Sequence, residues 1–317
     1  MPTPSDRSPG PVLEPAADLP GPAPGIAFAG IGDEAGGDPA DQIGALDRLG
    51  WRCLELRTVD GRAVADLGAA PFAALAADLH ARGVRVCCLD SRIGNWARPI
   101  TGPFDTDLHE LEILAARCAT LGAPAVRIMT YPGDGLGGPE WRRRAVERVR
   151  RLCDLAERRG IVLLAENCAG WAADDAERML DLLDTVASPA LGLLFDTGNG
   201  LAHGYHAPAL LADVADRVAH VHVKDALPGP AGGEPVYTVP GQGRAGVAQC
   251  LRLLLKHGYR GTWSIEPHLS LLPHRRDAAG SGDADGFTAA GEALQRLAAE
   301  TVAAARPEPA AGTGAPG

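Results

Sequence analysis

Lysine is almost absent from this sequence. Only two residues, Lys224 and Lys256, are lysines, and the 30 basic residues face 40 acidic ones, which gives a net charge of −10. The chain has no long basic run and therefore lacks the cationic surface that neutralises nucleic-acid phosphates. We expect no nucleic-acid partner.

Cysteine pairs at metal-finger or redox spacing are also missing. The seven cysteines are scattered, none forms a C-x-x-C pair, and their number is odd. This pattern is typical of reduced thiols in a cytosolic protein. The first 25 residues lack the basic flank and apolar run of a signal peptide, and no apolar run has the length of a membrane span. We expect a cytoplasmic protein without a membrane partner.

Both ends of the chain are rich in proline, glycine and alanine. Such segments cannot bury enough apolar surface to fold, so residues 1–24 and 305–317 are predicted to be disordered tails. Residues 25–304 are predicted to form a single domain, because a chain of 317 residues suffices for one barrel-sized core.

A helix-like segment, a glycine and a short apolar run recur along residues 25–304. Glycine just past a helix end adopts the left-handed conformation without steric cost, and it precedes five of the apolar runs, at Gly50, Gly83, Gly122, Gly160 and Gly258. Parallel strands need crossover helices, and eight such units over about 250 residues predict an α/β protein with the (β/α)₈ TIM-barrel fold. The predicted strands are Ile26–Ile31, Trp51–Leu56, Val84–Leu89, Ala125–Met129, Val162–Asn167, Leu191–Asp196, Val218–Asp225 and Thr262–His268.

Alternation of side chains along a strand predicts which residues point into the barrel. Polar groups that do so converge on the end of the barrel where active sites lie. The residues predicted to point inward are Cys53, Glu55 and Arg57 on the second strand, His220, His222 and Lys224 on the seventh, and Ser264, Glu266 and His268 on the eighth.

Strands five to eight each end near a residue able to hold a divalent cation: Glu166, Asp196, His222 and Glu266. An unpaired buried carboxylate is costly, and a shared ion would offset that cost. Three carboxylates and one imidazole form an oxygen-rich set that suits Mn²⁺, our first choice, or Mg²⁺ or Co²⁺. The sequence therefore predicts one divalent metal ion at the barrel mouth.

These strand ends carry the motifs of a known family. The chain resembles the xylose isomerase-like superfamily of TIM barrels, which contains sugar phosphate isomerases and epimerases, and the resemblance covers about residues 25–304. The matching motifs are Leu164-Ala165-Glu166-Asn167, Leu194-Phe195-Asp196-Thr197-Gly198-Asn199, His220-Val221-His222-Val223-Lys224-Asp225, Val239-Pro240-Gly241-Gln242-Gly243 and Ser264-Ile265-Glu266-Pro267.

The resemblance implies a metal-dependent isomerase or epimerase of a sugar or cyclitol. Glu166, Asp196, His222 and Glu266 would hold the ion, with His222 preferred over His220, and the two glutamates would be catalytic. One glutamate would remove a proton next to a metal-bound carbonyl to give an enediolate, and the other would return one. A lyase on the same scaffold is the alternative, either a 3-dehydroshikimate-type dehydratase or a β-eliminating deglycosidase of 3-keto glycosides. The partner would be a small carbohydrate, and homo-oligomer formation is left open.

Two departures from the ketose-epimerase pattern change the expected substrate contacts. Asn199 stands where those enzymes carry a histidine, and no arginine follows His222 where they carry one. Lys224 is a candidate replacement, with a salt bridge to Asp225 as the alternative role. Arg57 and Arg127 would either reach the mouth or neutralise Glu55. The predicted substrate-binding residues are Lys224, Asn199, Arg57, Trp171 and His268, and Trp96 is a second aromatic candidate beside Trp171.

Three other interpretations agree less well with the sequence. An open doubly wound sheet lacks a glycine-rich phosphate-binding motif after its first strand. A non-catalytic sugar-binding protein would not need the complete ligand set. An apurinic-site endonuclease of the same superfamily would need further metal ligands on the early strands and a basic face, and the net charge of −10 argues against it.

Overall fold

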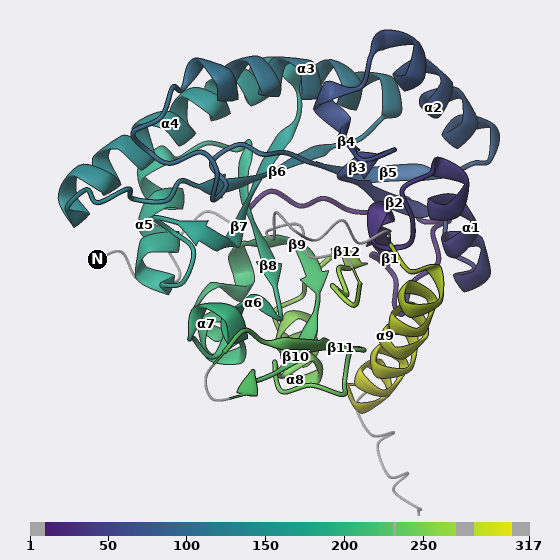
Figure 1. Cartoon of the computed structure of the whole chain (residues 1–317). Helices are drawn as coiled ribbons and strands as arrows, with labels where there is room; N and C mark the ends of the chain where they lie inside the picture. Colours follow the sequence, from purple (N-terminus) through teal and green to yellow (C-terminus); the bar gives the residue numbers. More distant parts are fainter. Residues whose placement is uncertain (1–9, 231–232, 271–281, 306–317) are drawn as a thin grey trace, which may run out of the picture.

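Eight parallel strands close into a barrel that is surrounded by helices (Figure 1). The computed structural model describes residues 10–230, 233–270 and 282–305. Around the barrel the strands follow the order β1-β12-β9-β8-β7-β6-β5-β2, so the predicted TIM barrel is confirmed. Their bounds are β1 Ile26–Ile31, β2 Cys53–Leu56, β5 Arg85–Asp90, β6 Ala125–Thr130, β7 Val162–Gly170, β8 Leu191–Asp196, β9 Val218–Val223 and β12 Gly261–Ile265.

Helices connect successive strands on the outside of the barrel, and α9 lies beside α1 to complete the ring (Figure 1). Asp38 caps α1 by accepting a hydrogen bond from the Ala40 amide at 2.6 Å. All five predicted glycine stops have φ between 65° and 74°, as left-handed helix ends require. The helices are α1 Pro39–Leu49, α2 Ala69–Ala81, α3 Asp105–Leu121, α4 Gly138–Arg159, α5 Ala176–Val186, α6 Asn199–His203, α7 Ala207–Val214, α8 Val247–Lys256 and α9 Ala284–Ala305.

Two short hairpins extend the loops at the C-terminal end of the barrel. One follows β2 and the other follows β9. The first pairs β3 (Thr58–Val59) with β4 (Arg62–Ala63), and the second pairs β10 (Asp225–Leu227) with β11 (Val236–Thr238). None of the helices in the described ranges combines the length and the apolar composition of a membrane span.

The barrel interior contains a small apolar cluster, with polar side chains beyond it towards the C-terminal end. Ala125, Leu164 and Leu194 form a small buried cluster inside the barrel. Two residues further along the same strands stand Arg127, Glu166 and Asp196, which share the inward face because strand side chains alternate. The larger core lies between the outer strand faces and the helices. This layering places the polar side chains at the mouth.

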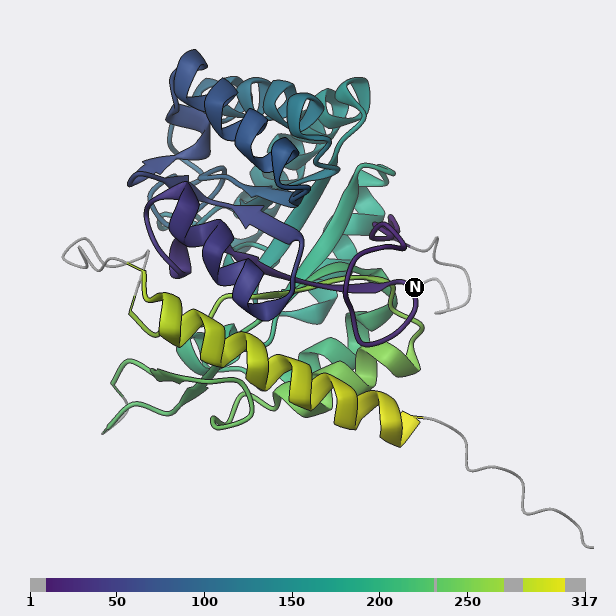
Figure 2. The same ribbon diagram turned by 90° about the vertical axis from the view of Figure 1, so that its right-hand side faces the viewer.

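Residues 10–24, which belong to the predicted N-terminal tail, are described and run across the N-terminal end of the barrel (Figure 2, dark purple). Leu13 packs against the small interior cluster, and Asp18 forms an ion pair with Arg85 at 3.1 Å. The Phe28 amide donates a hydrogen bond to the Pro20 carbonyl at 2.9 Å. The described fold therefore begins before the predicted boundary at residue 25. Residues 1–9 and 306–317 lie outside the described ranges.

Candidate metal centre and active site

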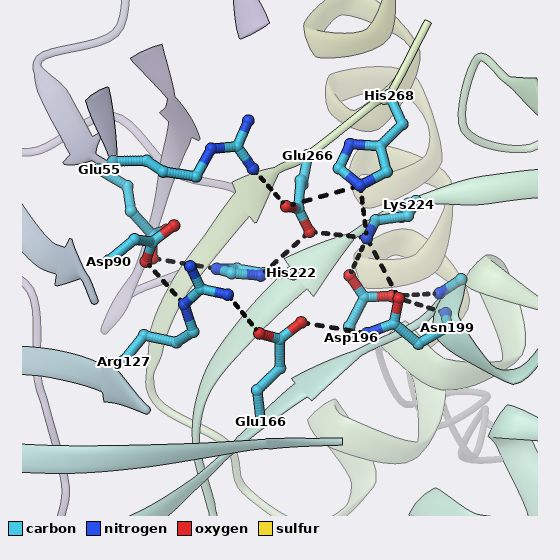
Figure 3. A network of polar contacts seen from close by, with 12 residues as sticks. Glu55, Asp90, Arg127, Glu166, Asp196, Asn199, His222, Lys224, Glu266 and His268 are labelled. Atoms are coloured by element: carbon cyan, nitrogen blue, oxygen red, sulfur yellow. Dashed lines mark hydrogen bonds and ion pairs between the residues drawn. The ribbon is translucent and has the colours of Figure 1, made fainter. Parts of the chain in front are cut away.

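Four potential metal ligands meet at the C-terminal end of the barrel (Figure 3). Glu166 lies in β7, Asp196 ends β8, His222 lies in β9 and Glu266 follows β12. Strand pairing places Asp196 beside His222. Each residue offers one ligand atom, these atoms lie within 4.8 Å of one another, and all four residues are buried. The structure thus brings together the set of residues expected to hold an ion.

An arginine holds each of the two glutamates. Arg127 donates from Nη1 to Glu166 Oε2 at 2.8 Å, and Arg57 donates from Nη1 to Glu266 Oε1 at 2.7 Å. Asn199 donates from Nδ2 to Glu166 Oε1 at 3.0 Å. Both arginines therefore reach the mouth, which was one of the two positions expected for them. Each carboxylate is fixed in orientation before any substrate enters.

The aspartate is oriented by backbone groups. Asp196 Oδ1 accepts hydrogen bonds from the amides of Gly198 at 2.7 Å and Asn199 at 2.8 Å. Asn167 holds the end of β8, because its side chain donates a hydrogen bond to the Asp196 carbonyl and accepts one from the Asp196 amide. Asp196 Oδ2 forms no hydrogen bond with the described residues. Asp196 can therefore offer this oxygen to the ligand set.

Glu55 bridges the two histidines of β9. Its Oε1 lies 3.0 Å from His222 Nε2 and its Oε2 lies 3.0 Å from His220 Nε2. His222 Nδ1 consequently faces the ligand set, 3.4 Å from Glu266 Oε2. His220 instead lies deeper in the barrel. This arrangement supplies a physical reason for preferring His222 as the ligand, because a carboxylate on the far nitrogen fixes the ring orientation of a metal-binding histidine.

Lys224 reaches the ligand set from the end of β9. Its Nζ lies 2.7 Å from Glu266 Oε2 and 3.1 Å from Asp196 Oδ2. It also contacts Asn199 Oδ1 at 3.2 Å and His268 Nε2 at 3.4 Å. The alternative role for this lysine, a salt bridge to Asp225, is not what the structure shows. Asp225 instead accepts backbone hydrogen bonds from Gly241, Gly243 and Ala245.

Negative charge predominates among the buried groups of the mouth. Seven buried carboxylates outnumber three buried cations, although burial raises the pKa of Asp90 well above its ordinary value. A bound divalent cation would offset part of the negative charge. The carboxylates are Asp33, Glu34, Glu55, Asp90, Glu166, Asp196 and Glu266, and the cations are Arg57, Arg127 and Lys224.

Burial and charge shift the pKa values of the ligands. Burial alone lowers the pKa of His222, but the Glu55 and Glu266 carboxylates raise it well above its ordinary value. Burial raises the pKa of Asp196, which Lys224 only partly offsets. Burial also acts to raise the pKa of Glu266, yet Lys224 and the two histidines near it hold that pKa well below its ordinary range.

Three of the four candidate ligand atoms have no hydrogen bond to the described residues. They are Asp196 Oδ2, His222 Nδ1 and Glu266 Oε2. Lys224 approaches the two oxygens as an ion pair only, outside hydrogen-bond geometry. Buried polar atoms normally have partners, so convergent atoms that lack them fit a site for a cation. The residues present therefore suit one divalent ion.

A cavity of about 210 Å³ opens beside the ligand set. Four of the five residues predicted to bind substrate line it, namely Lys224, Asn199, Arg57 and His268. His268 is held by Glu34, which lies 2.9 Å from its Nδ1 and also accepts a hydrogen bond from its amide. Further lining residues, most of them not predicted, are Trp96, Arg127, Met129, Cys168, Ala169, Ala202, His203 and Tyr237.

Trp171, the fifth predicted substrate-binding residue, lies away from the wall of this cavity. Its ring packs edge-on against Trp141 at 5.4 Å between centroids, and the Arg178 guanidinium stacks over it at 4.8 Å. Trp96 instead provides the aromatic surface, with 43% of its area exposed. The sequence placed both tryptophans in loops at the mouth, but it does not reveal which of them turns towards the cavity.

Comparison with known proteins identifies the family of the chain. The family model described as xylose isomerase-like TIM barrel matches residues 43–296. The chain belongs to the xylose isomerase-like TIM barrel family. The resemblance seen in the sequence motifs is thus confirmed over most of the described fold.

Named relatives of this family match about 40% of the chain. The rhizopine catabolism protein MocC of Rhizobium meliloti is 34% identical over 147 residues, which cover 41% of this chain and 44% of that protein. An inosose dehydratase of Bacillus licheniformis is 31% identical over 147 residues, which cover 40% and 46% of the two chains. The matches thus span about half the length of these relatives.

Solved structures of other proteins share the fold. A structure described as IOLI protein with a bound zinc atom superimposes with a TM-score of 0.67 at 16% identity, covering 86% of this chain and 98% of the other. At that level of identity the similarity establishes the fold alone.

Proposed function

We propose that this chain is a divalent-metal-dependent isomerase or epimerase that acts on the carbonyl form of a sugar or cyclitol. The supporting observation is the pair of glutamates that face one cavity, each fixed by its own arginine. Glu166 is held by Arg127 and Glu266 by Arg57, and all four line the cavity. One carboxylate can remove a proton from a bound substrate while the other returns one.

Glu166, Asp196, His222 and Glu266 would hold the ion. An ion bound there would polarise a substrate carbonyl and its neighbouring hydroxyl, and so acidify the carbon-bound proton between them. Three carboxylates and one imidazole are hard ligands, so we favour Mn²⁺, with Mg²⁺ or Co²⁺ as alternatives. Among proteins of similar fold, one is described with zinc and another with magnesium.

Proton transfer would be shared between the two glutamates. The glutamate that removes a proton must be ionised, and the structure favours that state in both glutamates. The glutamate that returns a proton must first have taken one up. Burial is the largest influence and acts to raise the pKa of Glu166, but the charges of Arg127, His222 and Lys224 together outweigh it and lower that pKa. For Glu266 the combined charges of Lys224, His268 and His222 likewise outweigh burial and lower the pKa. Proton removal by one glutamate and return by the other on the opposite face gives epimerisation, and return to the adjacent carbon gives isomerisation.

The substrate contacts would come from the remaining wall of the cavity. Lys224, Asn199 and His268 form a connected set of hydrogen-bonding groups beside Glu266, which suits the hydroxyls of a polyol. Trp96 offers an aromatic face for the carbon-bound hydrogens of a sugar or cyclitol ring. The volume of about 210 Å³ suits a monosaccharide-sized molecule.

A lyase is the second candidate, favoured by the pairing of Lys224 with His268. Their nitrogens lie 3.4 Å apart, so this pair could protonate a leaving hydroxyl after a glutamate has removed the neighbouring proton. Relatives of the chain include both inosose dehydratases and epimerases. Elimination releases water and creates a conjugated product, whereas epimerisation conserves the mass of the substrate.

Deuterium incorporation from solvent tests the proposal. Keto sugars and inososes would be incubated in D₂O with Mn²⁺-loaded protein and analysed by mass spectrometry. We expect metal-dependent incorporation that Glu166→Gln and Glu266→Gln abolish. Glu147→Gln, on the exposed face of α4, is the matched control and should leave incorporation unchanged. Incorporation that survives in either active-site variant would contradict the proton-transfer roles, and loss of water from the substrate would favour the lyase.

A further inference from the structure

A second group of metal-ligating side chains lies inside the barrel, below the catalytic mouth. Glu55, Cys87 and His220 each present one ligand atom, and these atoms lie within 4.8 Å of one another. His220 Nε2 lies 3.0 Å from Glu55 Oε2. Cys53 lines the same cavity as Cys87 and His220. None of these four residues belongs to the ligand set at the mouth.

A cavity of about 440 Å³ reaches this group from the N-terminal end of the barrel. Cys53, Cys87 and His220 form part of its wall, so a solvated ion could approach them without passing the active site. The segment that crosses this end of the barrel covers the cavity. Its contribution to the wall is Leu13, Glu14, Pro15, Ala16 and Leu19.

Cys87 lies at a bulge in the pairing of β2 with β5. Leu54 pairs with Val86 and Glu55 pairs with Cys88, so Cys87 is the extra residue of a bulge between β2 and β5. Bulges re-aim a side chain and leave it outside the regular pairing. The Cys87 thiol donates a weak hydrogen bond to the Leu54 carbonyl at 3.4 Å.

The donor types differ from those at the mouth. Two thiols, one imidazole and one carboxylate form a borderline-soft set, which Zn²⁺ prefers, whereas the mouth offers three carboxylates and one imidazole. Zinc–sulfur bonds of about 2.3 Å and zinc–nitrogen bonds of about 2.0 Å require donor atoms roughly 3.5 Å apart. Glu55 Oε2 and His220 Nε2 already lie 3.0 Å apart, and the Cys87 thiol lies within 4.8 Å of both residues' ligand atoms.

We propose that Cys53, Cys87, His220 and Glu55 form a zinc site at the N-terminal end of the barrel, separate from the catalytic centre. Binding of Zn²⁺ releases the protons of the two thiols to solvent, so that thiolates bind the ion. The two sites are connected, because the other oxygen of Glu55 holds His222 Nε2 at 3.0 Å. Occupation of the lower site thus fixes the carboxylate that orients a catalytic ligand.

Cobalt substitution distinguishes this site from the catalytic one. The full chain, stripped with a chelator and loaded with Co²⁺, should show a thiolate-to-cobalt charge-transfer band, which oxygen and nitrogen ligands do not give. Cys53→Ser and Cys87→Ser should each lose the band. Cys168→Ser is the matched control, because this cysteine lines the catalytic cavity, and it should keep the band. Asp196→Asn should also keep the band while losing about one bound metal ion per chain.

Alkylation of the unmodified chain provides a test that needs no substitution. Zn²⁺ should protect Cys53 and Cys87 from iodoacetamide at least tenfold more than it protects Cys168, as measured by peptide mass spectrometry. No charge-transfer band in the unmodified chain, a band that survives in a folded Cys87→Ser variant, or equal alkylation with and without Zn²⁺ would each overturn the proposal. A band lost in Cys168→Ser would place the thiolate at the catalytic cavity and would overturn it as well.

Discussion

Replacing Lys224 with methionine tests the idea that the mouth is built for a cation. The lysine is 3% exposed, and its ammonium lies 2.7 Å from Glu266 and 3.1 Å from Asp196. Methionine keeps much of the side-chain volume and removes the charge. Without a bound ion, the two carboxylates then lose their nearest cation, and the folded state should become less stable.

The magnitude follows from the burial of the pair. Breaking a buried ion pair by removing one partner costs about 3–5 kcal/mol, so we expect this loss in the free energy of unfolding when no ion is present. The ammonium also repels a bound ion, and its removal should tighten Mn²⁺ binding at least tenfold. Each tenfold gain in affinity is worth about 1.4 kcal/mol. In saturating Mn²⁺ the stability difference between Lys224→Met and the unmodified chain should therefore shrink by at least that amount.

Urea unfolding with a chelator and with saturating Mn²⁺ measures both differences. Lys256→Met is the matched control, because Lys256, the only other lysine, is exposed at the end of α8. It should change stability by less than about 0.5 kcal/mol in either condition. A stability difference for Lys224→Met that is the same with and without Mn²⁺ would refute the reasoning, because the ion would then have no electrostatic contact with this part of the mouth.

Three further predictions follow from the same geometry. Glu55→Gln should weaken Mn²⁺ binding by about 10–100-fold in calorimetric titrations, because it removes the carboxylate that orients His222; unchanged affinity would contradict this role. Neighbouring carboxylates raise the pKa of His222 well above its ordinary value, so an ion that binds its Nδ1 competes with a proton. Mn²⁺ affinity should therefore rise with pH, and Mn²⁺ binding should release protons. Calorimetric titrations in buffers of different ionisation enthalpy measure the proton release, and binding without proton release would contradict the prediction. Trp96→Ala should raise KM more than it lowers kcat, since the ring lies on the cavity wall; steady-state kinetics that show the reverse would argue against stacking.

Much of the fold could be predicted because its signals are local. Each predicted strand is an apolar run, and the glycines that precede five of them have the positive φ that glycine adopts without strain. The inward direction of Glu55, His220 and His222 followed from alternation along a strand. The ordered course of residues 10–24 could not be predicted in this way, because it depends on Leu13 reaching a cluster formed by distant strands.

The candidate site was predictable only in part. The four ligands end consecutive strands, and the order of strands in a barrel brings such residues together. The partners that hold them were harder to predict, because Arg57 could have turned either to Glu55 or to Glu266. The contacts of Glu34 and Tyr237 with His268 could not be predicted. Glu34 lies in a short 3-10 helix after β1 and Tyr237 in the β10–β11 hairpin, and the positions of both depend on tertiary packing.

The most direct test of the account is the position of Mn²⁺ in crystals of the protein, located by anomalous scattering. We predict one strong peak in contact with Glu166, Asp196, Glu266 and Nδ1 of His222, whose ligand atoms already lie within 4.8 Å of one another. A crystal with saturating Mn²⁺ and no peak there, or with the ion held by other residues, would contradict the proposed catalytic centre.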